Sequence, residues 1–233
     1  MHLILHVFVP YGLTHWVALA VTLLVWLVMF LLVRWQRPWH RSVEIGLAVV
    51  LLLQWVVGQT LAWKLGYFNP ATALPLHLCD VVAFLAGAAL LLRRQWMIEF
   101  SYFWGMAGTL NGLITPNLTY DFPHPAYFGF FALHSGVVIA ALHMTIAWKR
   151  LPRPNSVWRA FAWIQLYLVV VGGFNLLTGS NYGFFCARPE QPSPLDAMPP
   201  PPWHLLILEP LCLGLFWLFY WPFRRKSRAG NPV

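Results

Sequence analysis

The sequence predicts an all-α membrane protein, a seven-transmembrane-helix bundle that forms one polytopic domain over residues 1–233. Only 9% of the residues are charged and 59% are hydrophobic, with a mean hydropathy of +0.62. Soluble globular domains carry about 25% charged residues. Apolar segments long enough to cross a hydrocarbon core of about 30 Å recur seven times. Fourteen tryptophans fit aromatic belts at two water interfaces.

The seven apolar segments each contain about 17–24 residues, as a membrane-spanning helix requires. They cover approximately residues 13–33, 43–63, 75–92, 97–114, 126–148, 160–178 and 203–223. The fourth is the weakest, because three glycines and Asn111 interrupt it. Small residues let helix backbones approach closely. We therefore expect the fourth segment to lie inside the bundle.

Lysine and arginine are concentrated on one side of the predicted membrane. Thirteen of the fifteen follow segments one, three, five and seven, and only Lys64 and Arg188 fall on the other side. The positive-inside rule then predicts an outer N-terminus and a cytoplasmic C-terminus. Residues 1–6 lack the basic region of a signal peptide, so we expect the first segment to remain in place. The net charge of +8 favours anionic membrane lipids as partners and argues against nucleic acid.

The longest outer connection, residues 180–202, ends in four consecutive prolines. Such a run is stiff and extended. The connection is therefore either a fixed strap over the outer face or a spacer that leads into the last segment. Motifs of other protein classes are absent, since the three cysteines form no CxxC pair and no glycine-rich phosphate-binding loop is present.

Polar residues gather at one depth when a helical rise of about 1.5 Å per residue is applied to each segment. The outer half contains His15, Gln59, His77, Cys79, Asp80, Asn111, His134, Asn175 and Glu209. The inner half contains fewer, chiefly Gln54, Glu99 and His143. This layer predicts an outward-facing polar pocket. The alternative is a set of separate interhelical hydrogen bonds, each worth about 0.6 kcal/mol.

The third segment begins with an imidazole, a thiol and a carboxyl within four positions. Cys79 and His134 have the residue types of a thiolate nucleophile and its base, which would suit acyl transfer. Asp80, Glu209 or Asn111 would orient the imidazole. The alternative is that Cys79 fills space as a small apolar side chain. We expect that packing role for Cys212, whereas Cys186 in the outer connection is either free or oxidised.

Two other chemistries remain open for the same layer. Metal-assisted hydrolysis would use His77 and Asp80, which share a helix face, with His134 and Glu209. The His-x-x-x-His pair of seven-span zinc hydrolases is absent, so we expect no metal or other cofactor. Transport or sensing would use Glu209, because broken helices with buried carboxyls mark ion sites. Glu44 and Glu99 lie near the cytoplasmic ends, where we expect them to pair with arginines.

Five motifs resemble those of the YwaF-type bacterial integral membrane proteins: LPLHLCD at 74–80, YFWGMAGTL at 102–110, LITP at 113–116, FPH at 122–124 and NYGFFC at 181–186. That family in turn resembles the eukaryotic transmembrane protein 164 family of cysteine-dependent phospholipid acyltransferases, which have seven spans. The resemblance implies a multi-pass protein of the bacterial cytoplasmic membrane.

The same resemblance implies Cys79 as the nucleophile and His134 as the base of a lipid acyltransferase or lipid hydrolase. A lipid or its acyl chain would be the substrate. The pocket residues would be His77, Asp80, Asn111, Asn175 and Glu209. The alternative is a non-catalytic transporter, sensor or ligand-binding membrane protein that uses the same pocket.

Overall fold

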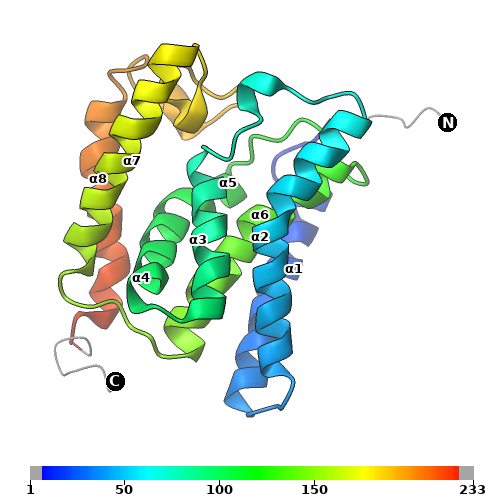
Figure 1. The fold of residues 1–233 in the computed structure, drawn as a ribbon, viewed down its shortest axis with the longest axis vertical. Coiled ribbons are helices and arrows are strands. Elements are labelled where there is room, and N and C mark those ends of the chain that lie inside the picture. Colours follow the sequence, from blue (N-terminus) through cyan, green and yellow to red (C-terminus); the bar gives the residue numbers. More distant parts are fainter. Residues whose placement is uncertain (1–6, 226–233) are drawn as a thin grey trace.

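The computed structural model describes residues 7–225 (Figure 1). The expectation for residues 1–6 therefore lies outside the described part, as do Lys226 and Arg228 of the last basic cluster. The chain is 73% helical. Within the described residues the only β-type pairing is an isolated bridge between Val7 and Tyr120. The prediction of an all-α protein is confirmed.

The helical elements follow the predicted segments to within a few residues. The longer ones are α1 (Leu13–Arg34), α2 (His40–Lys64), α3 (Leu78–Leu92), α4 (Gln95–Trp104), α5 (Leu110–Ile114), α6 (Pro125–Leu142), α7 (Ser156–Thr178) and α8 (Leu205–Tyr220). Two π-helical turns, η2 (Gly105–Thr109) and η3 (His143–Ala147), continue α4 and α6. Short 3₁₀ turns are η1 (Pro70–Thr72), η4 (Tyr182–Phe184), η5 (Pro194–Ala197) and η6 (Trp221–Phe223).

Helix α3 begins later than predicted, at Leu78 rather than at residue 75. His77 is its N-cap and has an extended backbone, with φ −64° and ψ 143°. The consequence is that Cys79 lies in the first turn of the helix instead of its second.

Five helical stretches are long and apolar enough to cross a membrane. They are Leu13–Arg34, His40–Lys64, Pro125–Ala147, Ser156–Thr178 and Leu205–Phe223. Helix α3 is apolar but has only 15 residues, and η2 interrupts the run from α4 to α5. These features identify a helical membrane protein with five candidate spans.

Helices α3, α4 and α6 occupy the middle of the molecule, with α1 and α2 on one side and α7 and α8 on the other (Figure 1). Every residue of α4 from Ile98 to Trp104 is buried, so the expected interior position of the fourth segment is confirmed. The flanking helices expose large apolar side chains such as Leu24, Val49 and Leu177. Such faces suit contact with lipid chains.

The connections α1–α2, α3–α4 and α6–α7 lie at the same end of the bundle as the end of α8 (Figure 1). We call this the basic end, because eleven of the thirteen described lysines and arginines belong to these connections or to the adjoining helix turns. The opposite end, which carries the α2–α3, α5–α6 and α7–α8 connections, is called the cavity end. The sequence prediction that positive charge gathers on one side is thus reproduced in space.

Glu44 of α2 is held at the basic end by four donors. Its Oε2 accepts hydrogen bonds from Arg41 and Arg93, each at 3.2 Å. Its Oε1 accepts from His143 Nε2 at 2.9 Å and from Trp148 Nε1 at 2.6 Å. The carboxylate therefore joins α2, the α3–α4 turn and the end of η3.

Glu99 of α4 is held in a comparable way. Arg153 donates to its two oxygens at 2.8 and 2.9 Å, and this pairing raises the pKa of Arg153. Arg159 lies 3.9 Å from the same carboxylate. The expectation that both glutamates pair with nearby arginines is confirmed. Removing one partner of such a buried pair is costly, because the other charge is left unpaired.

Candidate active site

A cavity of about 540 Å³ lies among α3, η2, α5, α6, α7 and α8. Its lining along α8 extends from Leu205 to Phe219, which at 1.5 Å per residue spans about 21 Å. Most of its walls are apolar, with Phe130, Ile164 and Phe216 among them. Half of a ~30 Å hydrocarbon core is about 15 Å. The cavity is therefore long enough to receive a lipid acyl chain.

The α7–α8 connection covers this cavity at the cavity end. Residues 183–185 and 191–195 of the connection contribute to the lining. Asn181 Oδ1 accepts hydrogen bonds from the N–H groups of Cys186 and Ala187 at 3.0 and 2.9 Å. His204 Nε2 is 3.1 Å from the carbonyl oxygen of Phe184. These contacts favour the strap over the spacer as the role of residues 180–202.

Cys79 lies in the first turn of α3, and its half-buried side chain lines the cavity as a free thiol. The N-terminus of a helix favours negative charge, so this position suits a thiolate. The hydroxyl of Thr109 in η2 lies close to the thiol. This hydroxyl has no other hydrogen-bond partner within residues 7–225. Tyr167 of α7 lines the same region, with its hydroxyl donating to the Leu76 carbonyl at 2.8 Å.

His134 of α6 lines the same cavity and has a defined tautomer. Its Nδ1 is 2.8 Å from the carbonyl oxygen of Phe130, and its ring stacks on Phe130 with centroids 4.0 Å apart. A carbonyl oxygen only accepts hydrogen bonds, so Nδ1 donates and the neutral ring keeps a lone pair on Nε2. A Cβ added to Gly112 would lie 2.9 Å from Nε2. The ring is therefore in the form of a general base, with Nε2 over the backbone of α5.

His77 lies close to His134 and shares the cavity with it. Its Nδ1 accepts a long hydrogen bond of 3.4 Å from the N–H of Gly183, and its ring contacts Tyr182 and Phe184. No hydrogen bond joins Cys79 to His134 within residues 7–225. The predicted nucleophile and base thus line one cavity without a hydrogen bond between them. Catalytic hydrogen bonds often form only once substrate is bound.

The other predicted pocket residues divide into two groups. Asn111 and Glu209 line the cavity, and Glu209 accepts a hydrogen bond from Gln165 of α7. Asp80 lies outside the lining, beside Gln54 of α2. Asn175 also lies outside it.

Two of the nine residues in the predicted outer layer are buried outside the cavity lining, where backbone groups are their partners. The buried side-chain amide of Asn175 donates to the carbonyl oxygen of Tyr182 at 2.8 Å and accepts from the N–H of Tyr182 at 2.9 Å. These two bonds fix the start of the strap. His15 is buried, and its Nε2 lies 2.9 Å from the carbonyl oxygen of Leu113. For His15 the alternative of a separate interhelical hydrogen bond holds, whereas Asn175 bonds the connection that follows its own helix. The described chain also contains no group of three or more His, Cys, Asp or Glu side chains arranged to hold a metal.

Sequence reasoning missed several residues that line the cavity or contact residues that do. Thr109 and Tyr167 lie beside Cys79, and Cys212, expected to be packing, lines the cavity beside Glu209. Gln165 carried a usable signal, because an amide inside an apolar segment indicates a polar partner at the same depth. Thr109 carried little signal, because a threonine is common in membrane helices and the π-helical turn that positions it has no sequence signature.

The family model of the TMEM164 family matches residues 10–220. The match includes every helix from α1 to α8 and both Cys79 and His134. No curated protein and no solved structure matches the chain.

Proposed function

We propose that this chain, which belongs to the TMEM164 family, is a cysteine-dependent lipid acyltransferase or lipid hydrolase with its active site in the long apolar cavity. One observation carries the proposal. A free thiol at a helix N-terminus and a histidine with an available Nε2 line the same acyl-sized space. The resemblance to the transmembrane protein 164 family of cysteine-dependent phospholipid acyltransferases points to the same chemistry.

The proposed reaction begins when Nε2 of His134 takes the proton of the Cys79 thiol. The thiolate attacks the ester carbonyl of a phospholipid, the C–O bond breaks, and the leaving alkoxide takes the proton from the imidazolium. A thioester with the acyl chain remains on the cysteine. An acceptor hydroxyl, or water in hydrolysis, then attacks the thioester while His134 removes its proton, and the thiol is restored.

The negative oxygen of each tetrahedral intermediate needs hydrogen-bond donors. The first turn of α3 supplies candidates, because its helical hydrogen bonding begins only with the N–H groups of Asp80 and Val81. The N–H groups of Leu78 and Cys79 precede these, and the Thr109 hydroxyl lies beside the thiol. We assign oxyanion stabilisation to these three donors.

The proposal includes the membrane arrangement. All seven helical segments would cross the bilayer, with α3 and the α4–η2–α5 run buried within the bundle. The basic end would face the cytoplasm and the cavity end would face outward. His77, Asn111 and Glu209 would contact the polar part of the lipid, while the acyl chain would extend along α8. Attaching a reporter domain at either end of the chain tests this orientation.

A thiol-reactive lipid probe tests the chemistry most directly. Because Cys186 is an exposed free thiol, the test uses a Cys186→Ser background. In this background the protein in detergent is expected to be labelled at Cys79, and Cys79→Ser is expected to abolish that labelling. His134→Ala should slow it at neutral pH, with recovery at high pH where the thiol ionises unaided. Cys212→Ser is the matched control, because Cys212 lines the same cavity and should leave labelling unchanged. Undiminished labelling of both Cys79→Ser and His134→Ala would refute the proposal.

A second candidate function is non-catalytic binding or transport. The observation that favours it is the hydrogen bond between Gln165 and Glu209, which lines the cavity. Pro210 lies inside α8 directly after this glutamate. A transporter should show ion-dependent or pH-dependent flux in liposomes that is lost in Glu209→Gln and retained in Cys79→Ala. An acyltransferase should show the opposite pattern, with product formation lost in Cys79→Ala.

A further inference from the structure

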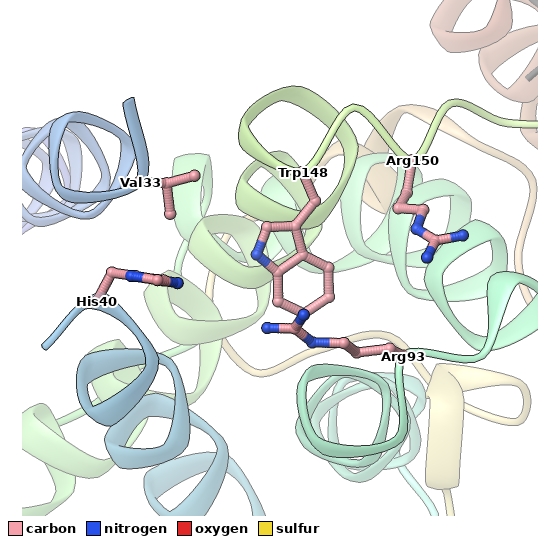
Figure 2. A pocket seen from close by; sticks show the side chains of 5 residues that line it. All are labelled: Val33, His40, Arg93, Trp148 and Arg150. Carbon is pink, nitrogen blue, oxygen red and sulfur yellow. The ribbon is translucent and has the colours of Figure 1, made fainter. Parts of the chain in front are cut away.

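A second cavity, of about 300 Å³, lies at the basic end, where four chain segments meet. Its lining consists of Val33 from α1, His40 from α2, Arg93 from the α3–α4 turn, and Trp148 and Arg150 from the segment after η3. Figure 2 shows the guanidinium of Arg93 beside the Trp148 ring, with His40 and Val33 across the opening. We call this the basic pocket.

Arg93 is held in place before any ligand arrives. Its guanidinium donates to Glu44 at 3.2 Å and lies 4.6 Å from the centroid of the Trp148 ring. Its backbone has φ 54°, a left-handed conformation that favours glycine and costs another residue about 1–2 kcal/mol. The chain therefore keeps an arginine where the backbone alone would favour a glycine.

The other two basic side chains of the pocket have unused hydrogen-bonding capacity. The side chain of Arg150 has no hydrogen bond or ion pair with any residue of the described chain. His40 Nδ1 is 2.7 Å from the carbonyl oxygen of Arg37, to which it donates, and its Nε2 has no such partner within residues 7–225. In the protonated form of a histidine ring both nitrogens donate, so Nε2 can then bond an anion.

The local charge balance is positive. Glu44 is the one carboxylate that pairs with the arginines here in the described chain, and Arg41 and Arg93 both contact it. When Arg150 is included, this region contains three guanidinium charges and one carboxylate charge. Planar guanidinium groups with free N–H donors match the oxygens of a phosphate group.

We propose that the basic pocket binds a phosphate group, held by Arg93, Arg150 and His40. Two sources share this chemistry, namely the headgroup of an anionic phospholipid and a soluble phosphate compound. Trp35 and Trp39 in the adjoining α1–α2 connection are 60% and 54% exposed, as is typical of residues at headgroup depth. The pocket is built from different residues than the Cys79 cavity, so the two proposals stand independently.

The experiment compares the purified full chain with Arg150→Gln and with the double variant His40→Gln/Arg150→Gln. Both changes are at side chains without a fold-supporting ion pair. Arg224→Gln is the matched control, because Arg224 is an exposed arginine near the end of α8 that does not line the pocket. In one arm, native mass spectrometry counts bound phosphatidylglycerol against phosphatidylcholine. In the other, thermal unfolding is followed with inorganic phosphate or chloride at equal ionic strength.

Binding should weaken about tenfold in Arg150→Gln, further in the double variant, and not in Arg224→Gln. Selective loss of phosphatidylglycerol identifies a lipid headgroup as the occupant. Loss of stabilisation by inorganic phosphate, without any difference between lipids, identifies a soluble phosphate compound. Equal weakening in Arg224→Gln, or wild-type binding in the double variant, would overturn the proposal.

Discussion

Ionisable side chains at the two ends of the bundle differ in how many hydrogen-bond partners the fold gives them. At the basic end, Glu44 and Glu99 are almost completely buried, and each is surrounded by several donors. At the cavity end, Cys79 and His134 line an apolar space and share no hydrogen bond with each other. Glu209 there has a single side-chain partner, Gln165.

The difference separates structural polar groups from candidate functional ones. Burying a charge is tolerated when its hydrogen-bonding capacity is satisfied by the fold. A polar group that lines a cavity keeps hydrogen-bonding capacity for a ligand. Residue type alone would not distinguish Glu44 from Glu209, whereas the number of their partners does.

The largest expected effect is on stability at the basic end. Glu44→Ala should lower the free energy of unfolding by about 3–5 kcal/mol, because it leaves two arginines, a buried histidine and an indole N–H without their acceptor. Thermal unfolding in detergent measures this. Glu209→Gln is the comparison at the cavity end and should cost about 1 kcal/mol. Equal losses in the two variants would remove the contrast between the ends.

The second prediction separates two arginines that face the same buried carboxylate. Arg153→Ala should cost about 3 kcal/mol, because it removes the bidentate partner of Glu99. Arg159→Ala should cost less than about 1 kcal/mol, since Arg159 is 3.9 Å away and half-exposed. Similar unfolding temperatures for the two variants would contradict the pairing seen here.

The third prediction tests the position of the His134 ring without removing it. Gly112→Ala would place a Cβ 2.8 Å from the ring, so the ring must move. Displacement of a catalytic group by about 1 Å costs up to about a hundredfold in rate, and we expect labelling of Cys79 by the lipid probe to slow at least tenfold. Gly129→Ala is the control on α6, the helix of His134. Its added Cβ would have no atom within 4 Å, so this variant should be labelled normally. Normal labelling in Gly112→Ala would argue against His134 as the base.

The smallest effect is expected at Asp80. This carboxyl adjoins Cys79 in sequence but lies outside the cavity lining, beside Gln54. Asp80→Asn should therefore change the labelling rate by less than about threefold, in line with substitutions away from a site. His77→Gln is the contrasting variant, because His77 lines the cavity. A larger loss in Asp80→Asn than in His77→Gln would reverse this assignment.

The fold was predictable from the sequence where hydropathy decides it. The seven apolar segments match seven helical runs, and the glycine-rich fourth segment is the buried one. The start of α3 was misplaced by three residues, because hydropathy does not register the extended backbone of His77. The π-helical turns at Gly105–Thr109 and His143–Ala147 were not predicted, since they depend on packing rather than on composition.

For the site, the sequence predicted depth alone. Depth placed nine polar residues in one layer, but depth does not tell which way a side chain points around its helix. Rotation about the helix axis puts Cys79 on the cavity and Asp80, one position later, beside α2. It also turns Asn175 toward the backbone of Tyr182, where it fixes the strap.

The sequence by itself determined that the protein is a helical membrane protein and which end carries the positive charge, and it predicted which polar residues share one layer. These follow from composition and from spacing along the chain, which are one-dimensional quantities. Only the tertiary structure decided which members of that layer meet. Helix rotation and packing between α3, α6 and α8 leave the acyl-sized space open beside Cys79 and His134, while at the other end they close around Glu44 and Glu99.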